Sequence, residues 1–309
     1  MRPALSVIFF TVSSGVGLGL LVWLVAMPLC GFAGYQNAAS VLPMLGLGMA
    51  LTAAGLLSST LHLANPKNAW RAFSQVRTSW LSREGVLAVA LFPLAILYAL
   101  LWIFPLLPTL RTVVGVILAA LALGVLYCTG MIYACLKTVP RWHTPLVPAG
   151  YLLLGLYSGA LVGLAFNVER GGAASSQGVI ALALLVAALI VKSLYYLKFR
   201  APVTVHSIND ALTLGPKSIR LLDVGHTHGT FLTDEFCFKL ARGHALALRV
   251  IAIVAGFVIP FVAITLGTRS VLPLSVAALV CALGLLAERW LFFAEAEHVV
   301  RLYHGSSRV

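Results

Sequence analysis

Residues 62–84 read HLANPKNAWRAFSQVRTSWLSRE, a basic segment that separates two long apolar runs. Asn65-Pro66 is typical of a helix N-cap followed by the first helical residue, so we expect a short helix to begin there. An apolar stripe at three- and four-residue spacing follows, made of Trp70, Phe73, Val76 and Trp80. This pattern predicts a helix that lies along a membrane surface, with its rings in the interface and its cations in water or on a partner.

The composition of the chain is that of an integral membrane protein. Of 309 residues, 61% are hydrophobic and only 10% are charged, and the mean hydropathy is +1.00, whereas a soluble domain carries roughly 25% charged residues. The net charge of +12 does not indicate nucleic-acid binding, because basic cytoplasmic loops are usual in polytopic proteins. Five scattered cysteines without a CxxC pair are expected to be reduced thiols.

Apolar runs of about 20 residues, the length of a membrane-spanning helix, occur eight times. We therefore predict an all-α polytopic membrane protein with eight transmembrane helices, forming a single domain over residues 1–309. The expected spans are 5–29, 41–63, 85–104, 112–135, 147–166, 177–197, 245–266 and 272–293.

The charges of the loops predict the orientation. Eight spans place both termini on one side, together with the 62–84 segment and a polar loop over 198–244 between the sixth and seventh spans. That side carries fifteen Lys and Arg residues, and the opposite side carries only Arg111, Arg170 and Arg269. By the positive-inside rule, the N- and C-termini, the 62–84 segment and the long loop are cytoplasmic. A loop of this length usually has a function, and we expect it to dock a soluble partner.

His62 and Glu84 end one span and open the next, so antiparallel helices bring both to the cytoplasmic membrane edge. Ionisable residues at membrane depth are functional candidates by default. Histidine suits proton exchange near neutral pH and a carboxylate suits a proton relay, which is what oxidation or reduction of a quinone requires. The alternative is that His62 caps a helix end and Glu84 pairs with Arg83 or Arg77 among the lipid headgroups.

Other polar residues in or beside the spans also have two interpretations. Trp142 follows the fourth span and is typical of an interfacial belt residue. Glu288-Arg289 lies inside the eighth span, where such a pair must face the bundle as a structural clamp or a proton path. Lys192 and Arg249 lie near span ends and can extend to the cytoplasmic surface.

The sequence gives little support to haem, metal or nucleotide sites. Only His62 of the eight histidines falls within a span, so no haem is expected, because haem b needs paired axial ligands. His226 and His228, with His206 and Cys237, match no standard zinc spacing, and we predict no metal site. The first six spans have few central charges, which favours an electron-transfer or anchor role over a small-solute transporter, the alternative from another class.

Three stretches resemble a known family. HLANPKNAWRAFSQVRTSWLSRE is similar to the HLG.P..A…R…S.LS.E signature of the membrane-anchor subunits of dimethyl sulfoxide reductase-type enzymes. TVPRWHTPLVPAGYL resembles the TVPxW segment that leads into the fifth span of that family, and LLAERWLFFAEAEH resembles its final helix more loosely. The likeness covers most of residues 1–200. Ala64 replaces the glycine after His-Leu, and the 198–244 loop is absent from the shorter anchors.

The resemblance implies a quinone-reactive anchor subunit without haem that is not, by itself, catalytic for the substrate. It implies a bacterial inner membrane location, menaquinone or ubiquinone as ligand, and two partners that carry the other cofactors, an iron–sulfur subunit and a molybdopterin catalytic subunit. The motif assigns quinone binding to His62 and Glu84 and, more weakly, to Trp80 and Arg77. The residues expected to dock the partner are Lys67, Trp70, Arg71, Trp142, Arg220, His226 and His228.

The predicted orientation distinguishes two branches of this family. Dimethyl sulfoxide reductase has an exported catalytic pair, whereas the charge pattern here predicts a cytoplasmic docking face. A cytoplasm-facing relative with the extra loop resembles the membrane subunit of quinone-linked sulfite dehydrogenase, which passes electrons from sulfite oxidation to quinone. The alternatives are the anchor of a dimethyl sulfoxide or related S/N-oxide reductase that oxidises quinol, and a purely structural anchor.

Overall fold

The computed structural model of the chain describes residues 4–32, 34–35, 37–61, 65–169, 174–200, 207–213, 219, 241–267 and 270–304. Within these ranges the protein is helical without β-strands, and eight helices are long and apolar enough to cross a membrane. The predicted fold class and number of spans are therefore confirmed.

Seven of the spans are single helices: α1 (Leu5–Leu29), α2 (Ala38–Thr60), α3 (Trp80–Ile103), α4 (Pro108–Ala134), α5 (Leu146–Glu169), α6 (Ala174–Lys198) and α11 (Val271–Ala294). The seventh along the chain runs without a break through α9 (Ala241–Ile253), η2 (Val254–Val258) and α10 (Ile259–Gly267). The remaining described helices are η1 (Pro66–Gln75), α7 (Ile208–Leu212) and η3 (Val299–His304).

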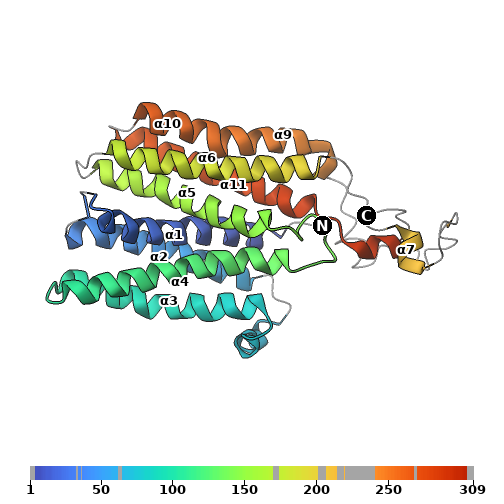
Figure 1. Ribbon diagram of the computed structural model, residues 1–309, viewed down its shortest axis with the longest axis horizontal. Helices are drawn as coiled ribbons and strands as arrows, with labels where there is room; N and C mark the ends of the chain where they lie inside the picture. Colours follow the sequence, from blue (N-terminus) through green and yellow to red (C-terminus); the bar gives the residue numbers. More distant parts are fainter. Residues whose placement is uncertain are drawn as a thin grey trace.

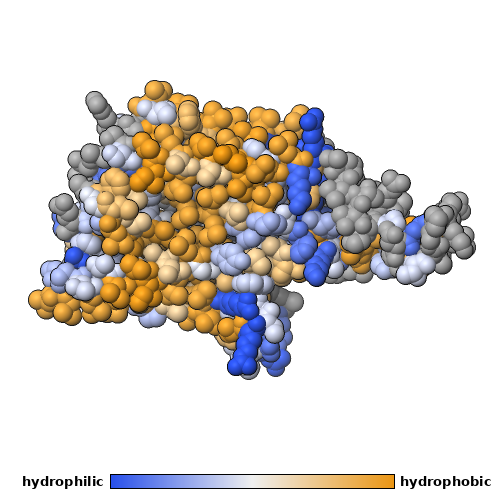
Figure 2. All heavy atoms as spheres, in the orientation of Figure 1, coloured by the Kyte–Doolittle hydropathy of each residue, from blue (hydrophilic) through white to orange (hydrophobic). Residues whose placement is uncertain are grey.

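The eight spans form an elongated bundle of roughly antiparallel helices (Figure 1). The helices α3 and α4 form one flank, and α6, α9 and α10 form the other, while α1 lies between them and contacts α2, α4, α5 and α11. On the face shown in Figure 2, hydrophobic side chains cover the body of the bundle, and most of the strongly hydrophilic ones lie at the end that carries η1. This distribution is the one expected of helices that face lipid along most of their length.

Small residues let the central helices approach closely. A β-carbon at Gly19 of α1 would lie 1.9 Å from the carbonyl oxygen of Gly155 on α5, and one at Gly159 would lie 2.1 Å from the carbonyl carbon of Gly19. Lipid tails are as apolar as leucine, so helix association in a bilayer depends on such close packing rather than on the hydrophobic effect. This contact fixes α1 against α5, the two helices that border the polar region described below.

The seventh span contains a π-helical turn with an identifiable cause. Pro260 has no N–H group, and its ring would clash with the carbonyl of Gly256 in a regular α-helix. The helix widens there: the N–H of Ile259 donates to the carbonyl oxygen of Val254, five residues earlier. The Gly256 carbonyl oxygen instead accepts a hydrogen bond of 3.0 Å from the Tyr157 hydroxyl on α5. The widened turn therefore ties the seventh span to the centre of the bundle.

A second polar link lies at the end of the bundle away from η1. Tyr35, in the connection between α1 and α2, accepts a hydrogen bond from Trp23 Nε1 at 2.9 Å and donates one to Gln177 Oε1 on α6 at 3.0 Å. Burial raises the pKa of Tyr35 to about 12, so the phenol keeps its proton and its donor role at physiological pH.

The segment between α2 and α3 contains the helix that the sequence predicts. Asn65 precedes η1, and Pro66 is its first residue, but η1 is a 3-10 helix rather than an α-helix, and Asn65 makes no side-chain cap bond. The third span begins at Trp80, five residues before the predicted start, because the Ser79 side chain caps it by accepting a hydrogen bond from the Ser82 N–H at 3.3 Å. Glu84 is therefore one turn inside α3 rather than at its first residue.

Candidate functional site

Glu84 is a buried carboxyl group near the η1 end of the bundle. Its side chain is 4% exposed and is hydrogen-bonded to the hydroxyl of Thr129 on α4. The same hydroxyl lies 2.9 Å from the carbonyl oxygen of Val125, one turn earlier on α4. A hydroxyl has one proton to donate, so it cannot serve both acceptors at once. The pair is therefore suited to an exchange of proton and hydrogen-bond roles.

The cation next to Glu84 in the sequence does not neutralise it. Arg83 donates from Nε to the Val76 carbonyl at 2.9 Å and from Nη2 to the Arg77 carbonyl at 2.6 Å, and its guanidinium carbon lies 4.2 Å from the centroid of the Trp80 ring. Among the described residues Glu84 has no ion-pair partner. The alternative interpretation, in which Glu84 forms an ion pair with Arg83 or Arg77, is therefore wrong.

The residues of η1 that were predicted to dock a partner lie on the surface. Lys67, Trp70 and Arg71 are exposed, and Trp70 has 65% of its surface accessible. The Arg71 guanidinium carbon lies 5.8 Å from the centroid of the Trp70 ring. This helix therefore presents cations and an aromatic ring to solvent, close to the N-terminal end of α3.

The two weaker quinone candidates lie between η1 and Glu84. Arg77 is exposed in the turn before α3, and Trp80 is half-buried as the first residue of α3. The Trp80 ring makes an edge-to-face contact with Tyr127 of α4, with centroids 5.8 Å apart. The structure thus places Arg77 just before α3 and Trp80 and Glu84 in its first turns, with the Trp80–Tyr127 pair beside them.

A band of polar and aromatic side chains crosses the bundle next to Thr129. Tyr133 follows Thr129 by four residues on α4, and its ring stacks on Tyr151 of α5 with centroids 5.7 Å apart. The Arg289 guanidinium carbon of α11 lies 3.9 Å from the centroid of the Tyr151 ring. These groups connect the region of Glu84, on α3 and α4, with the charged residues of α11.

The charged end of this band is a buried triad. Glu288 forms ion pairs with Lys192 of α6 and with Arg289, whose Nε lies 3.0 Å from Glu288 Oε2. The three residues are at most 7% exposed. Lys192 therefore does not extend to the cytoplasmic surface, contrary to the prediction, because Glu288 holds it inside the bundle. The arrangement fits the clamp interpretation, since both cations share one carboxylate.

Trp142 is not at the surface, although the sequence suggested a belt or docking residue. It is 4% exposed, donates a hydrogen bond from Nε1 to the Phe292 carbonyl at 3.1 Å, and stacks on the Phe292 ring with centroids 5.5 Å apart. Tyr133 also contacts Trp142, with centroids 5.2 Å apart. Its side chain fixes the turn between α4 and α5 against α11 and is not available for direct contact with a partner.

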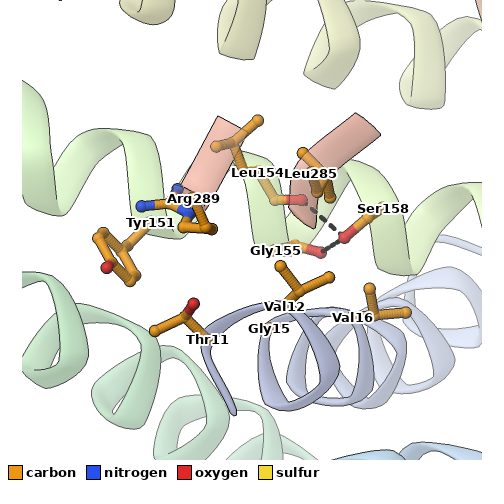
Figure 3. Close-up of a pocket in the computed structure, with 10 residues that line it drawn as sticks. All are labelled: Thr11, Val12, Gly15, Val16, Tyr151, Leu154, Gly155, Ser158, Leu285 and Arg289. Carbon is orange, nitrogen blue, oxygen red and sulfur yellow. Dashed lines mark hydrogen bonds between the residues drawn. The ribbon is translucent and has the colours of Figure 1, made fainter. Parts of the chain in front are cut away.

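A narrow cleft lies beside the polar band, between α1, α5 and α11 (Figure 3). Arg289 and Tyr151 lie together at one side of it, and Thr11 of α1 lies opposite. The Ser158 hydroxyl lies 2.7 Å from the Leu154 carbonyl oxygen and 3.1 Å from that of Gly155, so its one proton is taken up by the backbone of α5. The cleft therefore borders the Arg289 side of the band, but it is narrow and lined largely by apolar residues.

Several predicted residues lie outside the described part of the chain. These are His62 of the quinone set and Arg220, His226 and His228 of the docking set. Within the described ranges there is no group of three or more His, Cys, Asp or Glu residues that could hold a metal ion.

The sequence did not identify four residues as part of a functional site: Thr129, Tyr133, Tyr151 and Lys192. Thr129 and Tyr133 lie in an apolar helix with no distinctive motif, and only the packing of α4 on α3 shows that they adjoin Glu84. The spacing of four residues between them places them on one helix face, but does not show which face is buried.

The fold and the site together define a polytopic membrane protein with buried ionisable groups at one end and an exposed basic helix beside them. Residues 1–294 match the sequence model of the family described as the DMSO reductase anchor subunit (DmsC), and the chain belongs to this family. It is 34% identical over 325 aligned residues to a sulfite dehydrogenase subunit from Allochromatium vinosum, covering 99% of both proteins. It is also 32% identical over 123 residues to a component of the anaerobic dimethyl sulfoxide reductase of Escherichia coli, covering 39% of this protein and 42% of that one.

Proposed function

We propose that this chain is the quinone-reactive membrane anchor of a molybdenum and iron–sulfur oxidoreductase, and that it passes electrons from sulfite oxidation to the quinone pool. The observation that carries the proposal is Glu84, a buried carboxyl group that a neutral hydroxyl binds at the η1 end of the bundle. A carboxyl group in this environment is suited to proton transfer, because no cation in the described part of the chain forms an ion pair with it and fixes its charge.

The residues around Glu84 fit a quinone. Reduction of a quinone takes up two electrons and two protons, so its site needs proton donors beside an apolar wall. Glu84 would hold and release one proton, with Thr129 as its partner, and the Trp80–Tyr127 pair would supply the apolar wall. His62 would hydrogen-bond to the head group and exchange the second proton, as the family motif assigns it. Arg77 would attract the head group at the entrance.

The partner would dock at the same end of the bundle. Lys67, Trp70 and Arg71 form the exposed part of that surface, and cations with an aromatic ring suit an acidic face of an iron–sulfur subunit. Arg220, His226 and His228 of the long loop would extend this surface. The contribution of Trp142 would be indirect, through the turn between α4 and α5 that it anchors.

The direction of electron flow and the orientation rest on two observations. The relative that covers 99% of this chain is named a sulfite dehydrogenase subunit, and fifteen cations lie on the predicted docking side against three on the other. By the positive-inside rule, the docking face would lie in the cytoplasm, and the chain in the inner membrane of a bacterium. The shorter match to a dimethyl sulfoxide reductase component supports the alternative, a reductase anchor that oxidises quinol.

The test is a mild-detergent purification of the tagged full chain with its natural partners. Co-purification of molybdenum and iron, followed by sulfite-dependent reduction of a soluble quinone analogue, would support the proposal. Substrate-dependent oxidation of the matching quinol, without activity on sulfite, would instead support the reductase. A chain that purifies alone without either metal would contradict both.

Two variants separate a quinone site from a structural anchor. His62→Ala and Glu84→Gln should abolish quinone-linked turnover, yet leave the subunits assembled and electron transfer from sulfite to a soluble dye intact. Glu297→Gln, on the same side but outside the spans, is the matched control for Glu84. Unchanged quinone turnover in both site variants would show that the quinone reacts elsewhere.

A further inference from the structure

A second polar cleft lies at the same end of the bundle, on the opposite flank from η1. Its volume is about 380 Å³, and it is lined by Tyr196 and Leu197 of α6, Phe199 and Arg200 after α6, Arg249 of α9, Arg141 before α5 and Glu295 after α11. None of these residues belongs to the candidate quinone or docking sets. The cleft is therefore distinct from the site around Glu84, and its interpretation does not depend on the proposed function.

The cleft has an excess of positive charge. Arg249 Nη2 lies 2.5 Å and Arg141 Nη1 lies 3.4 Å from the two carboxylate oxygens of Glu295, so two arginines share one carboxylate. Arg200 is exposed, and no ion pair involves it among the described residues. Three guanidinium groups thus face one carboxylate, which leaves two positive charges to be balanced.

One donor in the cleft also lacks an acceptor. The Nε atom of Arg249 is buried, and no described group accepts a hydrogen bond from it. Buried N–H groups in proteins are nearly always hydrogen-bonded, so one without an acceptor in the chain is consistent with a ligand, an ion or a water at that place. A bound anion with several oxygen atoms would accept from Arg249 and balance the charge of Arg200.

The surroundings of the cleft identify the source of that anion. It lies where α6 ends at Lys198 and α11 ends at Ala294, at the border of the hydrophobic body (Figures 1 and 2). Two exposed apolar stripes lead from it along the flank of the bundle: Ile190, Leu194 and Leu197 on α6, and Val250, Ile253 and Val254 on α9 and η2. Acyl chains can lie along such stripes while the headgroup remains at the border.

We infer that this cleft binds the phosphate of an anionic phospholipid. Arginine recognises phosphate through several N–H donors in a fixed plane, and basic pockets between spans bind anionic headgroups at the membrane surface. Tyr196 and Phe199 form the aromatic wall, with the Arg249 guanidinium carbon 5.6 Å from the Tyr196 ring centroid and that of Arg141 5.8 Å from the Phe199 centroid. An acidic protein segment would not use the apolar stripes.

Native mass spectrometry of the delipidated full chain tests the assignment. The probes are phosphatidylglycerol, phosphatidylcholine with the same acyl chains, and inorganic phosphate. The expected result is preferential retention of phosphatidylglycerol that millimolar phosphate does not displace. Equal retention of the two lipids would overturn the inference, and displacement by phosphate alone would reassign the cleft to the free anion.

Substitutions of residues that line the cleft test whether the lipid binds there. Arg200→Gln removes an exposed cation and should weaken the preference for phosphatidylglycerol about fivefold. Arg249→Lys keeps the charge that pairs with Glu295 and should weaken it as well, because the ammonium group lacks the planar donor set. Lys137→Gln, which removes an exposed cation at the same end, should have no effect. If Arg200→Gln leaves the lipid preference intact and instead releases the partner subunits, the cleft is a protein-docking site and the inference is wrong.

Discussion

The Thr129 hydroxyl on α4 holds the carboxyl group of Glu84 on α3 through a hydrogen bond inside the bundle. This pair differs from Glu288, the other carboxylate that is buried in the described part of the chain, which forms ion pairs with two cations. A neutral partner stabilises either protonation state of a carboxyl group, because a hydroxyl can donate or accept. A cation fixes the charged state. Glu84 is therefore suited to proton exchange, whereas Glu288 is suited to holding helices together.

Thr129→Val should lower quinone-linked turnover about tenfold, since it removes the group that orients Glu84 and since positioned acid–base groups contribute large factors to such rates. The measurement is sulfite-dependent quinone reduction in membranes, normalised to the amount of assembled complex. Thr129→Ser keeps the hydroxyl and should retain turnover. Thr112→Val, an exposed threonine on the same helix, serves as the control. Turnover in Thr129→Val equal to that of the unmodified chain would show that Glu84 needs no partner.

Glu288→Gln should destabilise the bundle more than Lys192→Met. The glutamine leaves Lys192 and Arg289 as two buried cations without a carboxylate, whereas the methionine leaves one balanced pair, Glu288 with Arg289. Loss of one partner of a buried ion pair costs about 3–5 kcal/mol in general. The midpoint of thermal unfolding of the purified chain measures both effects.

For the triad, the informative result is which of the two variants, Glu288→Gln or Lys192→Met, lowers the unfolding midpoint more. If Lys192→Met is as damaging as Glu288→Gln, Lys192 stabilises the bundle by more than charge balance, and the expected order is wrong. Glu297→Gln, at a partly exposed ion pair with Arg301, should change the unfolding midpoint little, because surface pairs contribute about 0–1 kcal/mol.

The number of spans could be predicted from the sequence because every span is a run of apolar residues long enough to cross a bilayer. The starts of helices were harder to predict, since capping and not hydropathy sets them. Ser79 starts α3 before the apolar run begins, which moves Glu84 one turn inside the helix. Likewise, Asn65-Pro66 predicted the start of η1, although the pattern does not distinguish a 3-10 helix from an α-helix.

The candidate site could be predicted only where a motif or an ionisable residue marked it. Glu84 and Glu288 stand out because charges are rare in spans. Thr129, Tyr133 and Tyr151 do not, since hydroxyl groups are ordinary in membrane helices and contacts between distant helices are not visible in one sequence. The same reason explains Trp142: the sequence places it at the membrane edge, but only the packing of α11 shows that it is buried.

Tyr157→Phe should lower the stability of the bundle by about 1 kcal/mol, since the Gly256 carbonyl loses its hydrogen bond from α5. The widened turn at Pro260 leaves that carbonyl without its usual helical partner, so no backbone group replaces the hydroxyl. Thermal unfolding in detergent gives the change, with Tyr303→Phe, an exposed tyrosine, as the control. An unchanged midpoint would mean that another donor satisfies the carbonyl, such as the Cys281 thiol, whose Sγ lies 3.7 Å from that oxygen.

Acid should loosen the segment after α11. His298 Nδ1 accepts a hydrogen bond from the Val300 N–H at 3.0 Å, and burial lowers the pKa of His298 below its ordinary value of 6.5. The unfolded segment therefore binds a proton more readily than the folded one, so the stability present above pH 6.5 is lost as the pH falls from 6.5 toward the lowered pKa. Hydrogen exchange of residues 298–304, corrected for its intrinsic pH dependence, should show protection that falls by at most about tenfold per pH unit in that range. His298→Asn offers an oxygen acceptor that does not titrate and should remove the pH dependence while keeping the protection. A pH profile that persists in His298→Asn would assign the effect to another group.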